Sequence, residues 1–302
     1  MDLEKLLTEG RNPASIGIDQ LSTLDIIKCI NDEDQKVAAA VRQALPQIAQ
    51  AVEWTVDSLK TGGRLFYLGA GTSGRLGILD ASECPPTYGT SPEMVQGLIA
   101  GGETAVFQAV EGAEDSRALG EEDLQQKGLT ARDTVVGIAA SGRTPYVIGG
   151  LHYARAIGCK TVAISCTSQP ETGQIADLSI EILVGPEVVT GSTRMKAGTA
   201  QKMALNMLTT AAMIRLGKVY SNLMVDVQAT NNKLKERAKR IVCMATGVSK
   251  EQAEQTLAEA KGSAKIAITI LLAGVPLRQA TELLSAAGGN IAQALALARR
   301  SN

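Results

Sequence analysis

The chain reads Arg64-Leu-Phe-Tyr-Leu-Gly-Ala-Gly-Thr-Ser-Gly-Arg75 at the point from which its fold can be worked out. An apolar run, Leu65 to Leu68, is followed by a glycine-rich stretch, and the residues beyond it suit a helix. This order predicts a strand, a tight turn and a helix. Glycines permit the turn and the close approach of a ligand, and a helix N-terminus favours an anion. Because Thr72 and Ser73 add hydroxyl donors, a phosphate is the expected ligand.

The same spacing matches the dinucleotide fingerprint G-x-G-x-x-G, so a nucleotide site and an ordinary tight turn are open alternatives. The fingerprint requires an acidic residue about 20 positions later, at the end of the second strand. Here the second candidate strand, 94–100, is followed by Gly101-Gly-Glu103, so the nearest acid comes late. The loop by itself therefore favours a phosphate ester without excluding a nucleotide.

Composition limits the class of protein. The 302 residues suit one large or two modest domains. A net charge of −1 and 3% aromatic residues offer no electrostatic or stacking basis for binding nucleic acid. The N-terminus lacks the apolar core of a signal peptide, and the longest apolar stretch, 266–277, is too short for a bilayer. Five cysteines without a close pair suggest reduced thiols, so we expect a soluble, cytoplasmic protein that binds neither nucleic acid nor membrane.

Five apolar runs predict the architecture of the central part of the chain. They occupy residues 64–69, 94–100, 134–140, 161–166 and 178–184. Spacings of roughly 15 to 40 residues leave room for crossover helices, which predicts a five-stranded parallel sheet with helices on both faces. In such open sheets, ligands bind beyond the carboxyl ends of the strands.

Helical patterns flank the predicted sheet. Ser22-Thr-Leu-Asp25 is a capping box that opens a short helix. Beyond Asn31, apolar residues recur at steps of three and four up to position 59, and Pro46 marks a kink or a new start. After Gly217 the expected helices are 222–245, which carries many basic residues, 250–260, 263–273, 276–286 and 290–299. We therefore expect an N-terminal helical arm (1–60), an α/β domain (61–220), and a long helix plus a compact C-terminal helical domain (221–302).

Hydroxyl residues and glycines follow three of the five strands. Besides the loop after the first strand, the third run leads into Ser141-Gly-Arg-Thr-Pro145. The fifth run leads into Thr190-Gly-Ser-Thr-Arg-Met-Lys196. Because the carboxyl ends of parallel strands share one edge of a sheet, these loops predict a pocket for a small phosphorylated molecule. The alternative is ordinary turn chemistry.

Carboxylates are the groups best placed for acid–base chemistry. The only histidine, His152, lies within a predicted helix, and no cysteine spacing suits zinc, so neither a Ser-His-Asp arrangement nor a metal is favoured. A partly buried glutamate can act as acid or base near neutral pH. The candidates beside the strand ends are Glu83, Glu103, Glu111, Glu114 and Glu187. Composition alone does not separate them from surface glutamates.

Five strings of residues resemble those of the N-acetylmuramic acid 6-phosphate etherases, a family built on a sugar-isomerase (SIS) domain and related to the glucokinase regulatory proteins. They are Gly69-Ala-Gly-Thr-Ser-Gly-Arg75, Asp80-Ala-Ser-Glu-Cys-Pro-Pro86, Glu111-Gly-Ala-Glu-Asp-Ser116, Ala140-Ser-Gly-Arg-Thr-Pro-Tyr146 and Thr190-Gly-Ser-Thr-Arg-Met-Lys-Ala-Gly-Thr199. The likeness covers nearly the whole chain and is least distinct at the C-terminal tail. It implies an SIS-type three-layer α-β-α sandwich.

The resemblance also implies an activity, the cleavage of the lactyl ether of N-acetylmuramate 6-phosphate without a metal or another cofactor. The products would be N-acetylglucosamine 6-phosphate and D-lactate, as in the catabolism of cell-wall amino sugars. The resemblance assigns the proton-donor role to Glu83 and a second acid–base role to Glu114. The residues implied to bind the substrate are Gly71, Thr72, Ser73, Ser141, Gly142, Arg143, Thr144 and Ser192. A non-catalytic sugar-phosphate sensor and a sugar-phosphate isomerase remain open as alternatives.

The position of Glu83 raises a question of geometry. The helix after Ser73 is expected to stop at Cys84-Pro-Pro86, because proline cannot continue it. A straight helix would place Glu83 about 15 Å from its start. Glu83 then reaches the sugar only if the helix ends early or if it serves the site of a second subunit. We therefore expect a homodimer with composite sites.

Overall fold

The computed structural model describes residues 7–226 and 232–301. The chain divides into two compact units, one formed by Met1–Ser82 with Pro92–Thr209 and the other by Glu83–Ser91 with Thr210–Asn302. The division falls inside helices α3 (Gly71–Tyr88) and α8 (Lys196–Arg215). The first unit contains the large sheet, and each unit is described by itself below.

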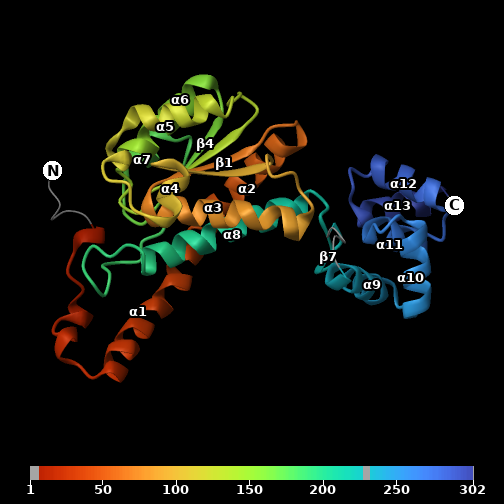
Figure 1. The fold of residues 1–302 in the computed structure, drawn as a ribbon, viewed down its shortest axis with the longest axis horizontal. Helices are drawn as coiled ribbons and strands as arrows, with labels where there is room; N and C mark the ends of the chain where they lie inside the picture. Colours follow the sequence, from red (N-terminus) through yellow and green to blue (C-terminus); the bar gives the residue numbers. More distant parts are fainter. Residues whose placement is uncertain (1–6, 227–231, 302) are drawn as a thin grey trace. The chain divides into compact units, whose positions relative to one another are not determined.

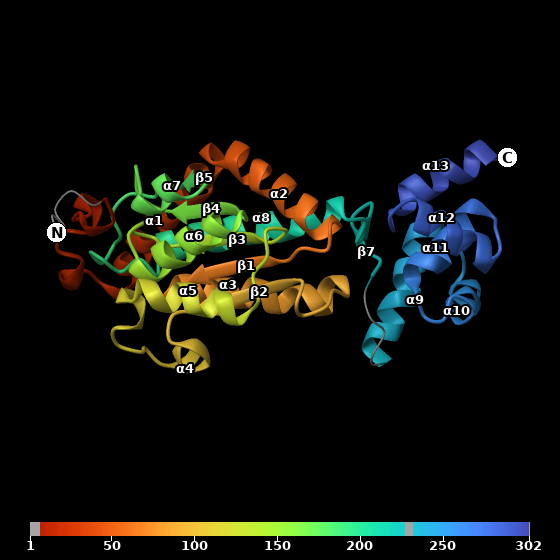
Figure 2. The ribbon, with the colours of Figure 1, turned by 90° about the horizontal axis from the view of Figure 1, so that it is seen from above.

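Five parallel strands form the sheet of the first unit (Figure 1), in the order β2-β1-β3-β4-β5 that Figure 2 shows from bottom to top. They are β1 (Leu65–Gly69), β2 (Val95–Ile99), β3 (Thr134–Ile138), β4 (Lys160–Ser165) and β5 (Leu178–Glu181). In register, Leu65 lies opposite Val95 on one side and Thr134 on the other. All residues of β1 and β3 are buried, which is why these strands read as continuous apolar runs. The predicted five-stranded parallel sheet is confirmed.

Helices cover both faces of this sheet (Figures 1 and 2). One face carries α5 (Arg117–Gln126), α6 (Pro145–Ile157) and α7 (Glu171–Ile175), and the other carries α2 (Leu45–Lys60), α3 and α8. On the first face Phe66 and Leu68 belong to one core cluster with Leu151. On the second face α3 packs closely, because a Cβ added at Gly77 would lie 2.9 Å from the Cβ of Tyr67. The three-layer sandwich predicted for this part of the chain is therefore confirmed.

A buried carboxylate joins three elements of the first unit. Asp80 of α3 accepts hydrogen bonds from the Tyr67 hydroxyl of β1 at 2.9 Å, the Asn206 Nδ2 of α8 at 2.8 Å and the Thr209 Oγ1 of α8 at 3.2 Å. Burial raises the pKa of this carboxyl. Because donors on both neighbouring elements surround it, Asp80 fixes the position of α3, whose N-terminus carries the glycine-rich turn.

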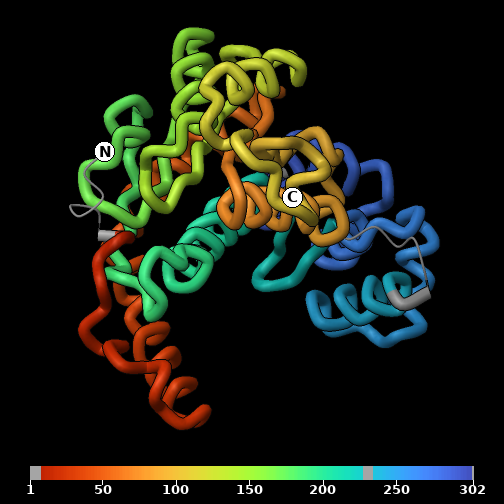
Figure 3. Tube along the Cα trace, turned by 60° about the vertical axis from the view of Figure 1, so that its left-hand side comes forward, coloured from red at the N-terminus to blue at the C-terminus, as the bar shows by residue number. Residues whose placement is uncertain are grey.

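The helix that opens at Ser22 is longer than the short helix we expected there. Helix α1 runs without a break from Thr23 to Gln43, and the Ser22 Oγ caps it by accepting from the Asp25 N–H. Helix α2 begins after Ala44 with Pro46 in its first turn, so the expected new start at this proline is confirmed. Figure 3 shows α1 within the red segment that projects from the rest of the first unit.

Helix α3 does not stop at its two prolines, and that prediction is wrong. Pro85 and Pro86 lie inside the helix, which reaches Tyr88. Each proline removes one N–H donor near the C-terminal end, where few helical hydrogen bonds remain to be lost. The last turn is held by the buried side chains of Cys84 and Tyr88 and by the Gly89 N–H, which donates to the Pro85 carbonyl at 2.9 Å. The helix therefore continues past Glu83.

The second unit is mainly helical. Its elements include an antiparallel pair, β6 (Val219–Tyr220) and β7 (Leu223–Met224), and the helices α9 (Asn232–Thr246), α10 (Lys250–Glu259), α11 (Ala264–Ala273), α12 (Leu277–Ala286) and α13 (Ile291–Ser301). Val242, Ala267 and Ile268 lie in their shared core. The helix predicted over 222–245 is wrong at its start, where β7 stands instead, and its residues 227–231 lie outside the described residues.

The described parts of the chain contain no single helix with the length and apolar character to cross a membrane. Helices α11 and α12 meet those criteria only when taken together, and they are bent by 105° at the break between them. Ala267, Ile268 and Leu284 of this pair are buried in the core of the second unit.

Candidate functional site

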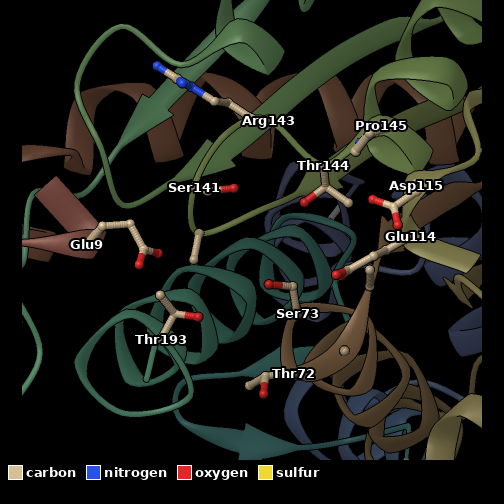
Figure 4. A pocket seen from close by; sticks show the side chains of 13 residues that line it. Glu9, Thr72, Ser73, Glu114, Asp115, Ser141, Arg143, Thr144, Pro145 and Thr193 are labelled. Atoms are coloured by element: carbon tan, nitrogen blue, oxygen red, sulfur yellow. The ribbon is translucent and has the colours of Figure 1, made fainter. Parts of the chain in front are cut away.

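A pocket of about 380 Å³ opens at the carboxyl ends of β1 and β3 in the first unit (Figure 4). It is lined by Glu9, Ala70, Gly71, Thr72, Ser73, Glu114, Asp115, Ala140, Ser141, Arg143, Thr144, Pro145 and Thr193. This is the edge at which ligands bind in open parallel sheets. The site predicted from the strand ends therefore coincides with a cavity.

The glycine-rich turn forms one wall of the pocket. A Cβ added at Gly69 would lie 2.7 Å from the Gly74 nitrogen, so a side chain at this crossing would force β1 and α3 apart. The close crossing brings the first turn of α3 to the pocket, where its free N–H groups favour an anion. The Ser73 hydroxyl donates to the Oε1 of Gln201 in α8 at 2.9 Å. Gln201 is 1% exposed, and its Nε2 has no hydrogen-bond partner among the described residues.

The loop after β3 forms a second wall. Gly142 has φ of +66°, and a Cβ there would lie 2.2 Å from the Pro170 Cβ, so this position requires glycine. Thr144 is the N-cap residue of α6, which places a second helix N-terminus at the pocket. Figure 4 shows Ser141 and Thr144 directed into the pocket, whereas the guanidinium of Arg143 turns away from Ser73. Hydroxyls and helix ends are therefore the donors that this pocket offers to an anion.

Carboxylates approach this pocket from two directions. Glu114 is exposed and lies in a 3-10 turn, Ala113–Asp115, that precedes α5. Glu9 lies on the opposite side in Figure 4, beside the loop before α8, because a Cβ added at Gly191 would be 3.2 Å from its Oε2. A cavity with anion-binding donors and carboxylates can bind a phosphorylated molecule and exchange protons with it.

The structure brings most of the sequence-predicted residues together, but not all. Those that line the pocket are Gly71, Thr72, Ser73, Glu114, Ser141, Arg143 and Thr144. Gly142 and Ser192 adjoin lining residues without lining the pocket themselves. Glu83 does not line it either. It is an exposed residue of α3, which continues past it to Tyr88.

Three charged or polar lining residues were not predicted. Asp115 and Thr193 are direct sequence neighbours of predicted residues, and that adjacency was the available signal. Glu9 carries no such signal, because the N-terminal segment reaches the pocket only through the fold. The candidate Glu187 has a structural role, since its buried carboxylate accepts from the N–H groups of Lys196 at 3.0 Å and Ala197 at 2.9 Å. Within the described residues, no group of three His, Cys, Asp or Glu side chains could hold a metal ion.

Comparison with protein families identifies models that match parts of this architecture. The chain matches the family models for the glucokinase regulatory protein N-terminal SIS domain over residues 47–155 and for the SIS domain over residues 119–211. Residues 221–264 match the C-terminal lid domain of glucokinase regulatory protein. A phosphoheptose isomerase from Francisella tularensis has a similar fold, with a TM-score of 0.51 and 17% identity over 64% of this chain and 100% of that chain.

Much closer relatives are found among curated protein sequences. The N-acetylmuramic acid 6-phosphate etherase of Photorhabdus laumondii is 58% identical over 299 residues, which cover 99% of either chain. The enzyme of the same name from Brucella anthropi is 58% identical over 97% of this chain and 96% of its own length. Identity at this level, over the whole length and including both units, confirms the resemblance seen in the sequence strings. The chain belongs to the N-acetylmuramic acid 6-phosphate etherase family.

Proposed function

We propose that this chain is a carbon–oxygen lyase that cleaves the D-lactyl ether of N-acetylmuramate 6-phosphate and releases N-acetylglucosamine 6-phosphate and D-lactate. The observation that carries the proposal is the identity of 58% over 299 residues with an etherase, in a chain that retains both motif glutamates. The pocket supports it, because Glu114 and the hydroxyls of two strand-end loops line one cavity.

The phosphate is assigned to the two helix N-termini. Thr72, Ser73, Ser141 and Thr144 supply hydroxyls there, and the first turns of α3 and α6 add backbone donors. Gly71 and Gly142 allow the backbone to approach the ligand, with Arg143 and Ser192 at the margin. Binding the phosphate at a distance from the reacting carbons positions those carbons relative to Glu114.

The chemistry follows from the ring-opened sugar. Its C1 aldehyde acidifies the proton on C2, so a carboxylate can remove that proton. The electron pair then forms the C2–C3 double bond as the C3–oxygen bond breaks, and a carboxylic acid protonates the departing lactate oxygen. Water next adds at C3 of the unsaturated aldehyde and a proton returns to C2, which balances the reaction. One carboxyl must hold a proton while the other is ionised, and this requires two different surroundings.

A second subunit is the proposed source of the second carboxyl group. Since α3 continues to Tyr88, it does not end early enough to bring Glu83 to the pocket of its own chain. We assign Glu83 of the partner subunit to that role, in a homodimer with composite sites. The arm (1–60) supports this assembly, because Leu21, Leu24 and Ile27 are 45–61% exposed beside or on α1. Of the other two segments, 61–220 is proposed to carry most of the pocket and 221–302 a C-terminal domain.

The test of the function is D-lactate release. Purified protein is supplied with N-acetylmuramate 6-phosphate, and lactate is measured with a D-lactate-specific dehydrogenase in the absence of added metal. We expect stoichiometric formation of D-lactate and N-acetylglucosamine 6-phosphate. The regulatory-protein family models favour one rival, a non-catalytic sensor, which would bind the sugar phosphate and release nothing.

The contact between Ser73 and Gln201 gives a prediction about phosphate binding. A serine hydroxyl has one proton, so it cannot donate to Gln201 and to a phosphate at once. We expect the Gln201 amide to rotate when phosphate binds, so that its unpartnered Nε2 donates to the Ser73 oxygen and frees the hydroxyl proton.

Gln201→Glu removes the donor, and we expect it to weaken the binding of N-acetylglucosamine 6-phosphate by about 10-fold or more, as for a lost charge-assisted hydrogen bond. The matched variant Gln201→Met has a similar volume, leaves the Ser73 proton free, and should bind within about threefold of the parent protein. Calorimetric titration distinguishes them. Equal losses in both variants would contradict the proposed rotation.

A further inference from the structure

A second cavity adjoins the pocket in the first unit. Its volume is about 180 Å³, roughly half that of the larger pocket. It is lined by Ala70, Gly71, Arg75, Ala100, Ala105, Ala109, Val110, Glu111, Gly112 and Glu114. Ala70, Gly71 and Glu114 line both cavities, so the proposed acid–base glutamate stands at their common wall.

The second cavity contains one cation, which the structure holds in place. Arg75 lies in the first turns of α3, and its Nε donates to the Val106 carbonyl at 2.8 Å. Its Nη2 donates to the Ala105 carbonyl at 2.9 Å. Both acceptors belong to α4 (Gly102–Phe107). The Nη1 group makes no hydrogen bond within the described part of the chain, which leaves a guanidinium edge for a ligand in a cavity otherwise lined mainly by alanine and valine.

We propose that this second cavity binds the lactyl arm of the substrate, with the lactyl carboxylate on Arg75 and its methyl group among the alanines. The inference rests on the proposed function. Because the proton-donor role is assigned to Glu83, Glu114 is left to remove the proton on C2, next to the carbon that bears the lactyl ether, and it must lie between the sugar and the leaving group. Glu114 has that position if the sugar phosphate fills the larger pocket and the leaving group fills the smaller one.

The positive charge of Arg75 favours the lactyl arm over its neighbour on the sugar, the acetamido group on C2. Both groups end in a methyl that suits a small apolar lining. Only the lactyl arm carries a carboxylate, the group for which a guanidinium with a free edge is suited. Glu111, an exposed residue, and Glu114 add negative charge, so Arg75 is what makes an anion acceptable there. Arg75 thereby becomes a specificity-determining residue.

The experiment compares two ligands that differ only in the lactyl arm. Calorimetry measures the affinity of N-acetylmuramate 6-phosphate and of N-acetylglucosamine 6-phosphate, in a Glu83→Ala background that suppresses turnover. In that background Arg75→Gln should weaken the first ligand about 10- to 100-fold, as for a lost hydrogen bond to a charged group, and change the second by less than about twofold. Arg75→Lys keeps the charge and should restore part of the loss.

Two further measurements test whether misfolding explains the effect of Arg75→Gln and whether the cavity binds the acetamido group instead. Ala109→Leu fills the cavity from an exposed position while Arg75 itself is kept, and should also weaken the lactyl ligand selectively. An analogue with the lactyl carboxylate converted to a neutral amide should bind the Arg75 protein as weakly as the acid binds the Arg75→Gln protein. If that analogue binds as well as the acid, the carboxylate is not on Arg75 and the proposal fails.

The outcomes also separate this inference from the proposed function. Equal weakening of both ligands by Arg75→Gln would mean that Arg75 only supports α4, and would overturn the lactyl site while leaving the etherase intact. If Arg75→Gln weakens the lactyl ligand selectively but the protein with Glu83 intact never releases lactate, the site is supported and the lyase is overturned. A protein that binds neither ligand overturns both.

Discussion

Glu114→Ala is expected to lower kcat/KM for D-lactate release by at least about 100-fold, and Glu83→Ala to lower it by a similar factor, the scale of general acid–base effects. Glu114 lines the pocket and stands at the wall between the two cavities, where a proton must reach or leave the sugar. The measurement is initial-rate kinetics with the coupled D-lactate assay. The affinity for N-acetylglucosamine 6-phosphate should change little, since neither carboxylate is assigned to the phosphate.

Two control variants sharpen this prediction. Glu103→Ala removes an exposed glutamate of α4 that lines neither cavity and should leave the rate within about twofold. Asp115→Ala removes a carboxylate beside Glu114 in the same pocket, and it tests whether the loss of any carboxylate from this pocket lowers the rate. Full activity in Glu114→Ala would remove Glu114 from the mechanism.

The two inactive variants together test the composite site. If Glu83 of the partner subunit completes each site, a heterodimer of Glu83→Ala and Glu114→Ala chains contains one intact site and one doubly damaged site. Random pairing would then restore about a quarter of the normal rate, because about half of the dimers are mixed and half of their sites are intact. Co-expression with two different affinity tags supplies the mixed dimer. A purified mixed dimer without activity would contradict sites that combine Glu83 and Glu114 from two chains.

The architecture of the sheet could be predicted because its central strands β1 and β3 are buried along their whole length. Such strands read as apolar runs, and the glycines after β1 mark where the run ends. The loops after β1 and β3 were predictable for a related reason, since every parallel strand delivers its carboxyl end to the same edge. Asp115 and Thr193, which adjoin predicted residues, enter the pocket with these loops.

The predictions from sequence failed where tertiary contacts override local signals. Pro85 and Pro86 are strong breakers in isolation, but burial of Cys84 and Tyr88 holds the last turn of α3. The consequence for function is direct, because a helix that ended early would have brought Glu83 nearer to the pocket. Glu9 could not be found for another reason. It reaches the pocket by contacts between segments far apart in the chain, which no local pattern records.

A buried ion pair, also invisible to sequence patterns, underlies the second large effect that we expect. Lys196, 1% exposed, lies 2.6 Å from Glu33 of α1, whose side chain is 4% exposed. Burial alone would raise the pKa of Glu33, but hydrogen bonds from Lys196, Lys36 and Asn12 outweigh it and lower the pKa to about 2. Lys196→Met leaves a buried carboxylate without its main partner, and should lower the free energy of unfolding by about 3–5 kcal/mol.

The single tryptophan allows this loss to be assigned to the correct unit. Trp54 lies in α2 of the first unit, so its fluorescence during urea unfolding reports on the unit that contains the pair. Lys28→Met is the matched control, because it breaks an exposed pair with Asp25 in the same helix and should cost less than about 1 kcal/mol. The double variant with methionine at positions 33 and 196 should recover much of the loss, since apolar side chains can replace a buried pair. Equal stability of Lys196→Met and the parent protein would contradict the argument.

The contribution of the same ion pair to stability should depend on pH. Because the pKa of Glu33 is lowered from 4.5 to about 2 in the folded protein, its contribution to stability is complete above about 4.5 and is lost as the pH falls toward 2. The stability difference between the parent protein and Glu33→Gln should therefore shrink over this interval.

The ion pair between Glu33 and Lys196 also matters for the candidate site. The arm's Asn12 Nδ2 donates to the Pro186 carbonyl at 3.1 Å and its Ser15 Oγ to the Val188 carbonyl at 2.7 Å, just before the loop that bears Thr193. Loss of the pair should thus loosen the arm that carries Glu9, and weaken sugar-phosphate binding along with stability.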